Sequence, residues 1–219
     1  MNSLSSNTTG SQNNAFGYFS LLNNTTGSNN TAFGNRSLQS NTTANNNLAI
    51  GDRSLQLNTV GSENTSIGTT ALLSNTTGNQ NVSIGEAAGR YITGLGPNNI
   101  TNNSIYIGWR ARANADNETN QIVIGHNAIG LGSNTTVIGN SSTTFGRWFG
   151  SLLLGTSTNV ASSMFTMDST TQGFLPPRMT AAQRTAIASP AEGLIVYQTD
   201  SVIGLYIYAN ATWRTLGMI

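Results

Sequence analysis

The sequence predicts an all-β protein built from short stacked repeats, and three observations support this prediction. An Ile-Gly or Phe-Gly pair returns every 17 residues, at Gly17, Gly34, Gly51, Gly68 and Gly85. The positions before each glycine alternate in character, as they do in a short β-strand. Asn, Thr, Ser and Gly fill the intervals between these strands. A fixed period this short indicates units stacked along one axis rather than a fold around one central core.

The repeated pair defines the predicted core of the stack. The predicted core residues are Phe16, Gly17, Phe33, Gly34, Ile50, Gly51, Ile67, Gly68, Ile84, Gly85, Ile107, Gly108, Ile124, Gly125, Ile138 and Gly139. Because side chains alternate along a strand, we expect the Phe and Ile side chains to face the core. The small residues Ala15, Ala32 and Ala49 stand between the apolar ones, and they would permit close approach of neighbouring chains.

The rest of each coil supplies a second anchor, a ladder and turns. A second apolar anchor follows the glycine by four residues, at Leu21, Leu38, Leu55 and Leu72. Side chains bonded up and down the stack are predicted for Asn13, Asn30, Asn47, Asn64 and Asn81, which recur in register. The Asn-Thr-Thr-Gly segments at 7–10, 24–27 and 75–78 are typical of turns, because Asn and Gly tolerate left-handed backbone conformations.

Asparagine usage marks the domain boundary. Of 30 Asn residues, only Asn159 and Asn210 lie beyond residue 150. We therefore expect a repeat shaft over 1–141, a neck or connector over 142–173 and a C-terminal module over 174–219. Six extra residues before Gly108, around 94–97, predict a surface loop, and the shortened last coil predicts a capping turn.

The last two segments have different patterns from the shaft. The neck contains an aromatic stretch at 145–150 and a predicted strand at 152–154. Thr180 and Gln183 fit a helix capping box, and the short helix continues to 186–188. Three apolar runs at 194–197, 205–208 and 213–216 then predict a β-meander. The module is therefore a small α+β unit.

The composition excludes several classes of protein and favours an oligomer. Charged residues make up 8% of the chain, every basic residue is Arg, and the net charge of +1 provides no footprint for nucleic acid or an anionic membrane. The apolar runs are too short to insert into a bilayer, and the first residues lack the pattern of a signal peptide. About three apolar side chains per coil make a thin core for one chain, and without cysteines no disulfide can reinforce it. We therefore expect identical chains to associate and to bury further apolar surface between them.

The repeat residues resemble a known family. Gly-Ser-Asn-Asn-Thr-Ala-Phe-Gly at 27–34 and Gly-Asn-Gln-Asn-Val-Ser-Ile-Gly at 78–85 are similar to the head repeats of trimeric autotransporter adhesins. The resemblance covers residues 1–141 and implies a left-handed parallel β-roll in which three chains associate. The 17-residue form is also similar to repeats of bacteriophage fibre proteins. Residues 173–216 resemble a C-terminal module of phage fibres, through Leu175–Met179, Gln183-Arg184 and Gly193–Tyr197.

Candidate chemical sites are few. His126 is the one histidine, and it stands in a variable slot that we expect to face outward, so no metal or cofactor site is predicted. No pair among the eight carboxylates is identifiable as a glycosidase pair, so we expect no enzyme. Trp109, Arg110 and Arg112 form a candidate surface for stacking on sugars, and packing between chains is the alternative.

These observations together predict a non-enzymatic fibre on the surface of a phage particle, from tail or head. It would attach to the bacterial surface through multivalent binding to a host glycan or protein. The expected partners are two further copies of the chain and other virion proteins. The alternatives are a fragment of a trimeric adhesin on a bacterial cell surface and a spike that cleaves polysaccharide.

Overall fold

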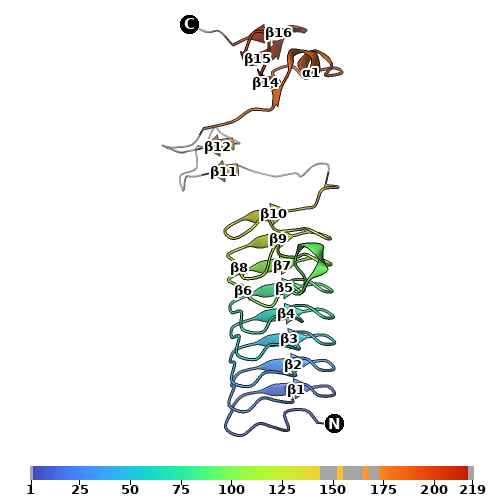
Figure 1. Ribbon diagram of the computed structural model, residues 1–219, viewed down its shortest axis with the longest axis vertical. Coiled ribbons are helices and arrows are strands. Elements are labelled where there is room, and N and C mark those ends of the chain that lie inside the picture. Colours follow the sequence, from blue (N-terminus) through green and yellow to red (C-terminus); the bar gives the residue numbers. More distant parts are fainter. Residues whose placement is uncertain (1, 144–151, 155–164, 168–172, 217–219) are drawn as a thin grey trace. The chain divides into compact units, whose positions relative to one another are not determined.

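The computed structural model describes residues 2–143, 152–154, 165–167 and 173–216. The chain divides into two compact units, Met1–Gly146 and Arg147–Ile219. The first is a β-solenoid and the second contains two small sheets, which confirms the all-β class (Figure 1). The aromatic stretch predicted at 145–150 lies outside the described residues. The left hand of the coil and the association of three chains stay predictions.

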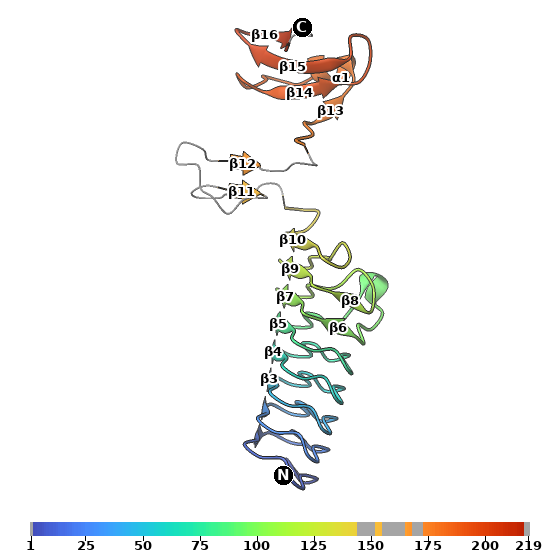
Figure 2. The ribbon, with the colours of Figure 1, turned by 90° about the vertical axis from the view of Figure 1, so that its left-hand side faces the viewer.

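Eight three-residue strands form one parallel sheet along the solenoid. They are β1 (Asn14–Phe16), β2 (Thr31–Phe33), β3 (Leu48–Ile50), β4 (Thr65–Ile67), β5 (Val82–Ile84), β7 (Ile105–Ile107), β9 (Ile122–Ile124) and β10 (Thr136–Ile138). Their order in the sheet is their order in the chain. Equivalent repeat positions lie side by side, as in the pair Ala15 and Ala32. Figure 2 shows these strands along one side of the solenoid.

The recurring glycine is required by the closeness of successive coils. Gly17 has a φ of 138°, and a Cβ added there would lie 2.4 Å from the carbonyl oxygen of Gly34 in the next coil. A side chain would be strained by the backbone and would also collide with that oxygen. Four further glycines of the 17-residue array repeat this geometry. The sequence period therefore reflects the axial spacing of the coils.

The strand face that lines the interior of each coil is not the one that we predicted. Ala32 and Ala49 are buried inside their own chain, so they do not face neighbouring chains. The Phe and Ile side chains of the predicted core point outward instead: Phe16 is 66% and Phe33 53% exposed. The prediction of which strand face is buried was therefore wrong for the single chain. A coil of 17 residues encloses a narrow space. The small inward residue of each strand occupies little of this space, so the leucine from the opposite side of the coil can fill it.

The second apolar anchor is confirmed. Leu21, Leu38, Leu55 and Leu72 are fully buried and form a column with the strand alanines. Each of these leucines has a φ between 45° and 51°, in the left-handed region that is unfavourable for a bulky side chain. Burial of a leucine contributes about 1.5–3 kcal/mol, which exceeds the conformational cost of about 1–2 kcal/mol.

The residues that fill the interior change at β7, the sixth strand of the eight-stranded sheet. Gly89 occupies the slot of the leucine column, and a Cβ there would lie 2.8 Å from Leu72 Cδ2 and 3.0 Å from Tyr106 Cδ2. Tyr106 takes the strand slot that holds Ser83 one coil earlier, and it is fully buried. The large side chain thus moves from one wall of the coil to the other. A second apolar cluster of Tyr106, Val123 and four alanines continues the core beyond this point.

Asparagine ladders connect the coils at two places. The predicted ladder is confirmed, because Asn47 Nδ2 donates to Asn30 Oδ1 at 3.2 Å and also to the Gly61 carbonyl at 2.9 Å. A second ladder runs through Asn7, Asn24, Asn41, Asn58 and Asn75. Asn7, Asn24 and Asn75 were predicted as turn formers only, and no role was predicted for Asn41 and Asn58. Each of them also donates to the carbonyl three residues ahead, so one side chain closes a turn and joins two coils.

The extra residues before Gly108 form the predicted surface loop. They contain a 3-10 turn, η1 (Thr93–Leu95), whose residues are exposed. Behind the loop, β6 (Thr101–Asn102) pairs in parallel with β8 (Glu118–Thr119). The coil then returns to its register, since β5 pairs directly with β7.

The second unit contains two small sheets. β11 (Leu152–Leu154), predicted as a strand, pairs in parallel with β12 (Phe165–Met167). The four-stranded sheet contains β13 (Arg178–Met179), β14 (Ile195–Gln198), β15 (Gly204–Ala209) and β16 (Thr212–Thr215), in this order. The meander β14–β16 was predicted and β13 was not. Helix α1 (Ala181–Thr185) begins with the predicted capping box, but it ends earlier than expected, with Ala186 as its C-cap.

Shortening a leucine of the buried column tests the core. Leu55→Ala should lower the free energy of unfolding by roughly 2–5 kcal/mol, because it leaves a cavity between the walls of the coil. Thermal and denaturant unfolding measure this change. Leu57→Ala is the matched control, since Leu57 lies two residues away and is 43% exposed. Equal effects of the two changes would contradict this description of the interior.

The asparagine ladder makes a second prediction. Asn47→Asp removes the amide donor to Asn30 and Gly61 and places a carboxylate beside their oxygens. It should lower the free energy of unfolding by roughly 2–4 kcal/mol at neutral pH. Asn45→Asp is the control: Asn45 is exposed and its Oδ1 accepts from the Ser28 backbone N–H, which a carboxylate also does. If both variants unfold alike, the donor role of the ladder is wrong.

Candidate functional site

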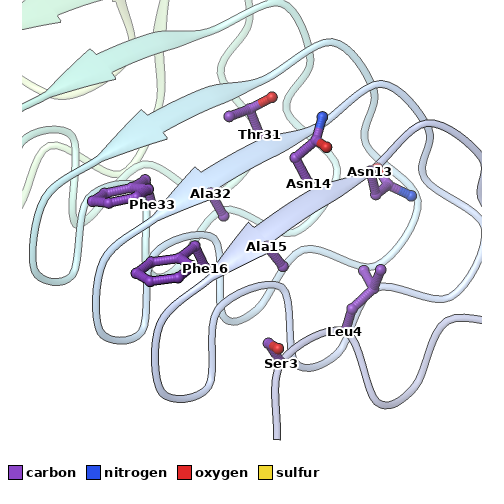
Figure 3. Close-up of a pocket in the computed structure, with 9 residues that line it drawn as sticks. All are labelled: Ser3, Leu4, Asn13, Asn14, Ala15, Phe16, Thr31, Ala32 and Phe33. Carbon is purple, nitrogen blue, oxygen red and sulfur yellow. The ribbon is translucent and has the colours of Figure 1, made fainter. Parts of the chain in front are cut away.

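The outward face of the eight-stranded sheet is the most extended candidate surface. We define the outward strand face as the first and third residues of β1–β5, β7, β9 and β10. Its third positions hold two phenylalanines and six isoleucines, of which Phe16, Phe33 and Ile138 are more than half exposed. The Phe16 and Phe33 rings stack, with centroids 4.9 Å apart and planes at 11° (Figure 3).

This face has the character of a contact surface. Its two columns contain apolar residues, threonines and one asparagine, without a single charged side chain. Soluble monomers rarely expose a contiguous apolar stripe that extends over a whole domain. The Phe and Ile residues of the predicted core therefore lie together on this face, and the glycines of the predicted core directly follow the strands.

Trp109, Arg110 and His126 lie together on the turn that follows the strands. The Trp109 and His126 rings belong to successive coils and stack, with centroids 4.8 Å apart and planes at 15°. The Arg110 guanidinium carbon lies 4.5 Å from the centre of the Trp109 ring. Trp109 is 37% exposed, and His126 is exposed as predicted. The sequence signal for this cluster is the recurrence of one slot, which holds Trp109 and then His126.

Arg112 does not belong to this surface. Its side chain is buried, and Nη1 donates to the Arg110 carbonyl at 3.3 Å and to Asn127 Oδ1. Burial lowers the pKa of Arg112, and the charge of Arg110 lowers it further. The prediction of Arg112 as a surface recognition residue was therefore wrong. Position 112 falls on an inward slot of the coil, between the buried Ala111 and Ala113.

Asp116 fixes the chain beside the surface loop. Its Oδ1 accepts from the Ile100 N–H at 2.8 Å and from the Asn117 N–H at 3.0 Å, and its Oδ2 accepts from Asn99 Nδ2 at 3.0 Å. Burial by itself raises the pKa of Asp116, but these donors favour the charged form and bring the pKa below its ordinary value. The carboxylate therefore has a structural role in the insertion.

Asp52 and Glu63 accept hydrogen bonds from amide side chains one coil away. Asp52 Oδ1 accepts from Asn35 Nδ2 at 2.8 Å, and Asp52 also pairs loosely with Arg53 at 3.8 Å. Glu63 accepts from Gln80 Nε2 at 2.9 Å. Within the described ranges, no three His, Asp or Glu side chains gather in a metal-binding group. In the same part of the chain, no helix is both long and apolar enough to span a bilayer.

The four-stranded sheet of the second unit carries a surface that the sequence analysis missed. Helix α1 contacts β14 on one side, where Val196, Gln198 and Tyr206 are buried. Ile195 and Leu205 point to the other side, and each is 38% exposed. The run Leu194-Ile195-Val196-Tyr197 is apolar on both sides of the strand, so the sequence did not single out this second face.

Comparison with known proteins bears on this second unit. Residues 153–218 match the family model described as "Phage tail like trimerisation region". The match covers β12 to β16 and α1, and it leaves the solenoid outside. No curated protein and no solved structure matches the chain. A phage tail-like trimerisation region beside a β-solenoid fits a fibre-type structural protein of a phage, and it supports association as a homotrimer.

The Asp116 contacts predict a dependence of stability on pH. Because the folded-state pKa of Asp116 is lowered, its contribution is complete above the unfolded pKa of about 4 and is lost as pH falls through the folded value. Asp116→Asn should therefore lower the melting temperature at pH 6, and the difference from the unmodified chain should shrink as pH falls below 4. Calorimetry from pH 2 to 7 measures both proteins. A difference that stays constant over this range would contradict the role of the charge.

Proposed function

We propose that this protein is a non-enzymatic fibre of a bacteriophage particle, in which three chains form a left-handed shaft that reaches the bacterial surface. The observation that supports this most directly is the uncovered outward strand face, which runs along all eight strands. The match of residues 153–218 to a phage tail-like trimerisation region supports the same assembly from the other unit.

The outward strand face explains why the shaft needs more than one chain. The interior of a coil buries one leucine and one small strand residue, so most large apolar side chains stay outside it. Covering apolar surface contributes about 25 cal/mol per Å². Three copies that turn this face toward a common axis would bury the Phe and Ile columns of every coil. The thin core of the single chain is then completed by a shared core.

The fibre would attach to the bacterial surface through several equivalent sites, each of which binds weakly. A three-chain fibre presents each surface three times, and linked weak contacts give an avidity far above that of one site. The Trp109 and Arg110 cluster is our candidate for contact with a host glycan or protein, because an aromatic ring beside a guanidinium suits both. The second unit would hold the three chains in register or bind other virion proteins.

A trimeric adhesin on a bacterial cell surface is the competing function, since the solenoid repeats are similar to those of adhesin heads. The match to a phage tail-like region favours the particle over the cell surface. A spike that cleaves polysaccharide receives less support, because Asp52 and Glu63 accept hydrogen bonds from neighbouring amides and Asp116 has a structural role.

The shared core is tested by a charge placed on the outward strand face. Ile50→Asp should lower the melting temperature of the full chain strongly, because three carboxylates would meet in an apolar core. Val60→Asp is the control, since Val60 is 49% exposed on a turn away from the strands. Light scattering of the unmodified chain should give three chain masses. Equal, small effects of both substitutions would show that the outward face is uncovered.

Whether the protein is part of a virion is tested on purified particles of the phage whose genome carries its gene. Mass spectrometry of purified particles should detect the chain, and antibodies against it should label fibres in electron micrographs. The purified full chain should compete with phage adsorption, whereas heat-unfolded chain should not. A chain found on the bacterial envelope and absent from particles would support the adhesin instead. Capsular polysaccharide incubated with the protein should keep its length.

A further inference from the structure

A polar hollow lies on the solenoid between two successive coils, on the turns that precede β4 and β5. It has a volume of about 320 Å³ and is lined by Ser62, Glu63, Asn79 and Gln80. Gln80 Nε2 donates to Glu63 Oε2 at 2.9 Å. Glu63 and Gln80 stand 17 residues apart, so the two coils contribute this bonded pair from the same position of the repeat.

Glu63 and Gln80 occupy a repeat position whose backbone favours asparagine. The residue five positions before the repeated glycine has a φ between 52° and 63° in each coil of the eight-stranded sheet, and its side chain is exposed. Asparagine adopts this left-handed conformation more readily than longer side chains do. Five coils carry it, at Asn29, Asn46, Asn103, Asn120 and Asn134. The exceptions are Gln12, Glu63 and Gln80, and the last two have an avoidable conformational cost at one hollow, which is typical of a functional site.

The coils hold the other polar groups of the hollow in place. The Ser62 N–H donates to Asn79 Oδ1 at 2.8 Å, and Asn79 Nδ2 donates to the carbonyl two residues before it at 3.0 Å. The Ser62 hydroxyl oxygen accepts from the Asn45 N–H at 3.0 Å. Among the described residues, no group donates to Glu63 Oε1 or to Gln80 Oε1. The hollow therefore combines fixed polar groups with acceptors that are available to a ligand.

The chemistry of the hollow fits an uncharged sugar. Neighbouring hydroxyls of a sugar can donate to a carboxylate and to an amide oxygen, and bonds to an ionised acceptor are the stronger ones. The turn segments 58–64 and 75–81 contain Glu63 as their only charged residue, so an anionic sugar would be repelled. Val60 replaces the threonine found at this slot in the four other regular coils, and it is 49% exposed. An exposed apolar side chain on the same turn as Glu63 suits the C–H groups of a sugar ring.

We infer that the hollow around Glu63 and Gln80 binds a neutral polysaccharide of the bacterial surface, through hydrogen bonds from sugar hydroxyls to these two side chains. The inference rests on the proposed attachment function, to which it adds a site and a class of ligand. The hollow is separate from the cluster of Trp109 and Arg110, which carries a cation. Its lining residues also lie outside the outward strand face that the proposed shaft would cover. A fibre of three chains would present the hollow three times, so that each contact can be weak.

The repeat itself supplies the variant that tests this site in the full chain. Glu63→Asn introduces the residue that the slot favours, so the carboxylate is lost while the melting temperature should not fall. Surface polysaccharide purified from the host bacterium is separated by anion exchange into a neutral and an acidic fraction, and biolayer interferometry measures binding of the full chain to each. We expect the neutral fraction to bind, and Glu63→Asn to weaken this binding at least about ten-fold. Asn29→Glu, the reverse change two coils away, is the matched control and should bind as the unmodified chain does.

The outcomes separate this inference from the proposed function. Weaker binding of the neutral fraction by Glu63→Asn, with an unchanged melting temperature and full binding by Asn29→Glu, supports the inference. Binding of the acidic fraction alone, binding of neither fraction, or equal binding by Glu63→Asn and the unmodified chain overturns it and leaves the detection of the fibre on phage particles intact. A lower melting temperature of Glu63→Asn also overturns it, because Glu63 would then have a structural role. A chain that is absent from particles but binds the neutral fraction through Glu63 overturns the proposed function and supports the site.

Discussion

Hydrogen bonding along the solenoid axis is the constraint on which the rest of the first unit depends. A strand of three residues cannot satisfy its backbone within its own coil, so its amides and carbonyls pair with the coils before and after it. The Asn amides do the same, since Asn30 Nδ2 reaches both Asn13 Oδ1 and the Ala44 carbonyl. Equivalent residues must therefore stack in register, and the close approach at Gly17 and its equivalents follows.

Axial bonding also determines how little apolar surface a coil can bury. Most of its residues serve turns and ladders, and the space that they enclose accepts one large side chain per coil. The exchange of Leu72 for Tyr106 at the slot of Gly89 shows this limit, because the large side chain changes wall while the other wall becomes small. Apolar residues beyond this capacity lie outside, on the outward strand face. The association that we propose for the shaft would thus follow from the geometry of the coil.

Much of the architecture was predictable because repetition amplifies weak signals. One Phe-Gly or Ile-Gly pair indicates little, but five such pairs at a single period indicate coils, strands, the leucine column and the ladder at Asn47. The ladder through Asn41 was missed because an Asn at the start of a short polar segment also suits a turn, and the structure shows that Asn41 serves both purposes. Arg112 was misplaced because a charged side chain suggests the surface, whereas position 112 stands four residues after Gly108, in the slot that holds the buried Leu21 and Leu38 in earlier coils. β13 was missed because two residues carry no periodicity.

The sequence by itself determined the period, the strands, the turns and the restriction of the repeats to the first part of the chain. These properties depend on local chemistry: glycine where coils touch, asparagine where amides stack, and alternation where a strand runs. Only the tertiary structure decided which side of each strand lies inside. Alternation defines two faces without naming the inner one, and that choice depends on the volume enclosed by the closed coil. Ala49 fits this volume beside Leu55, and Ile50 is left to face outward.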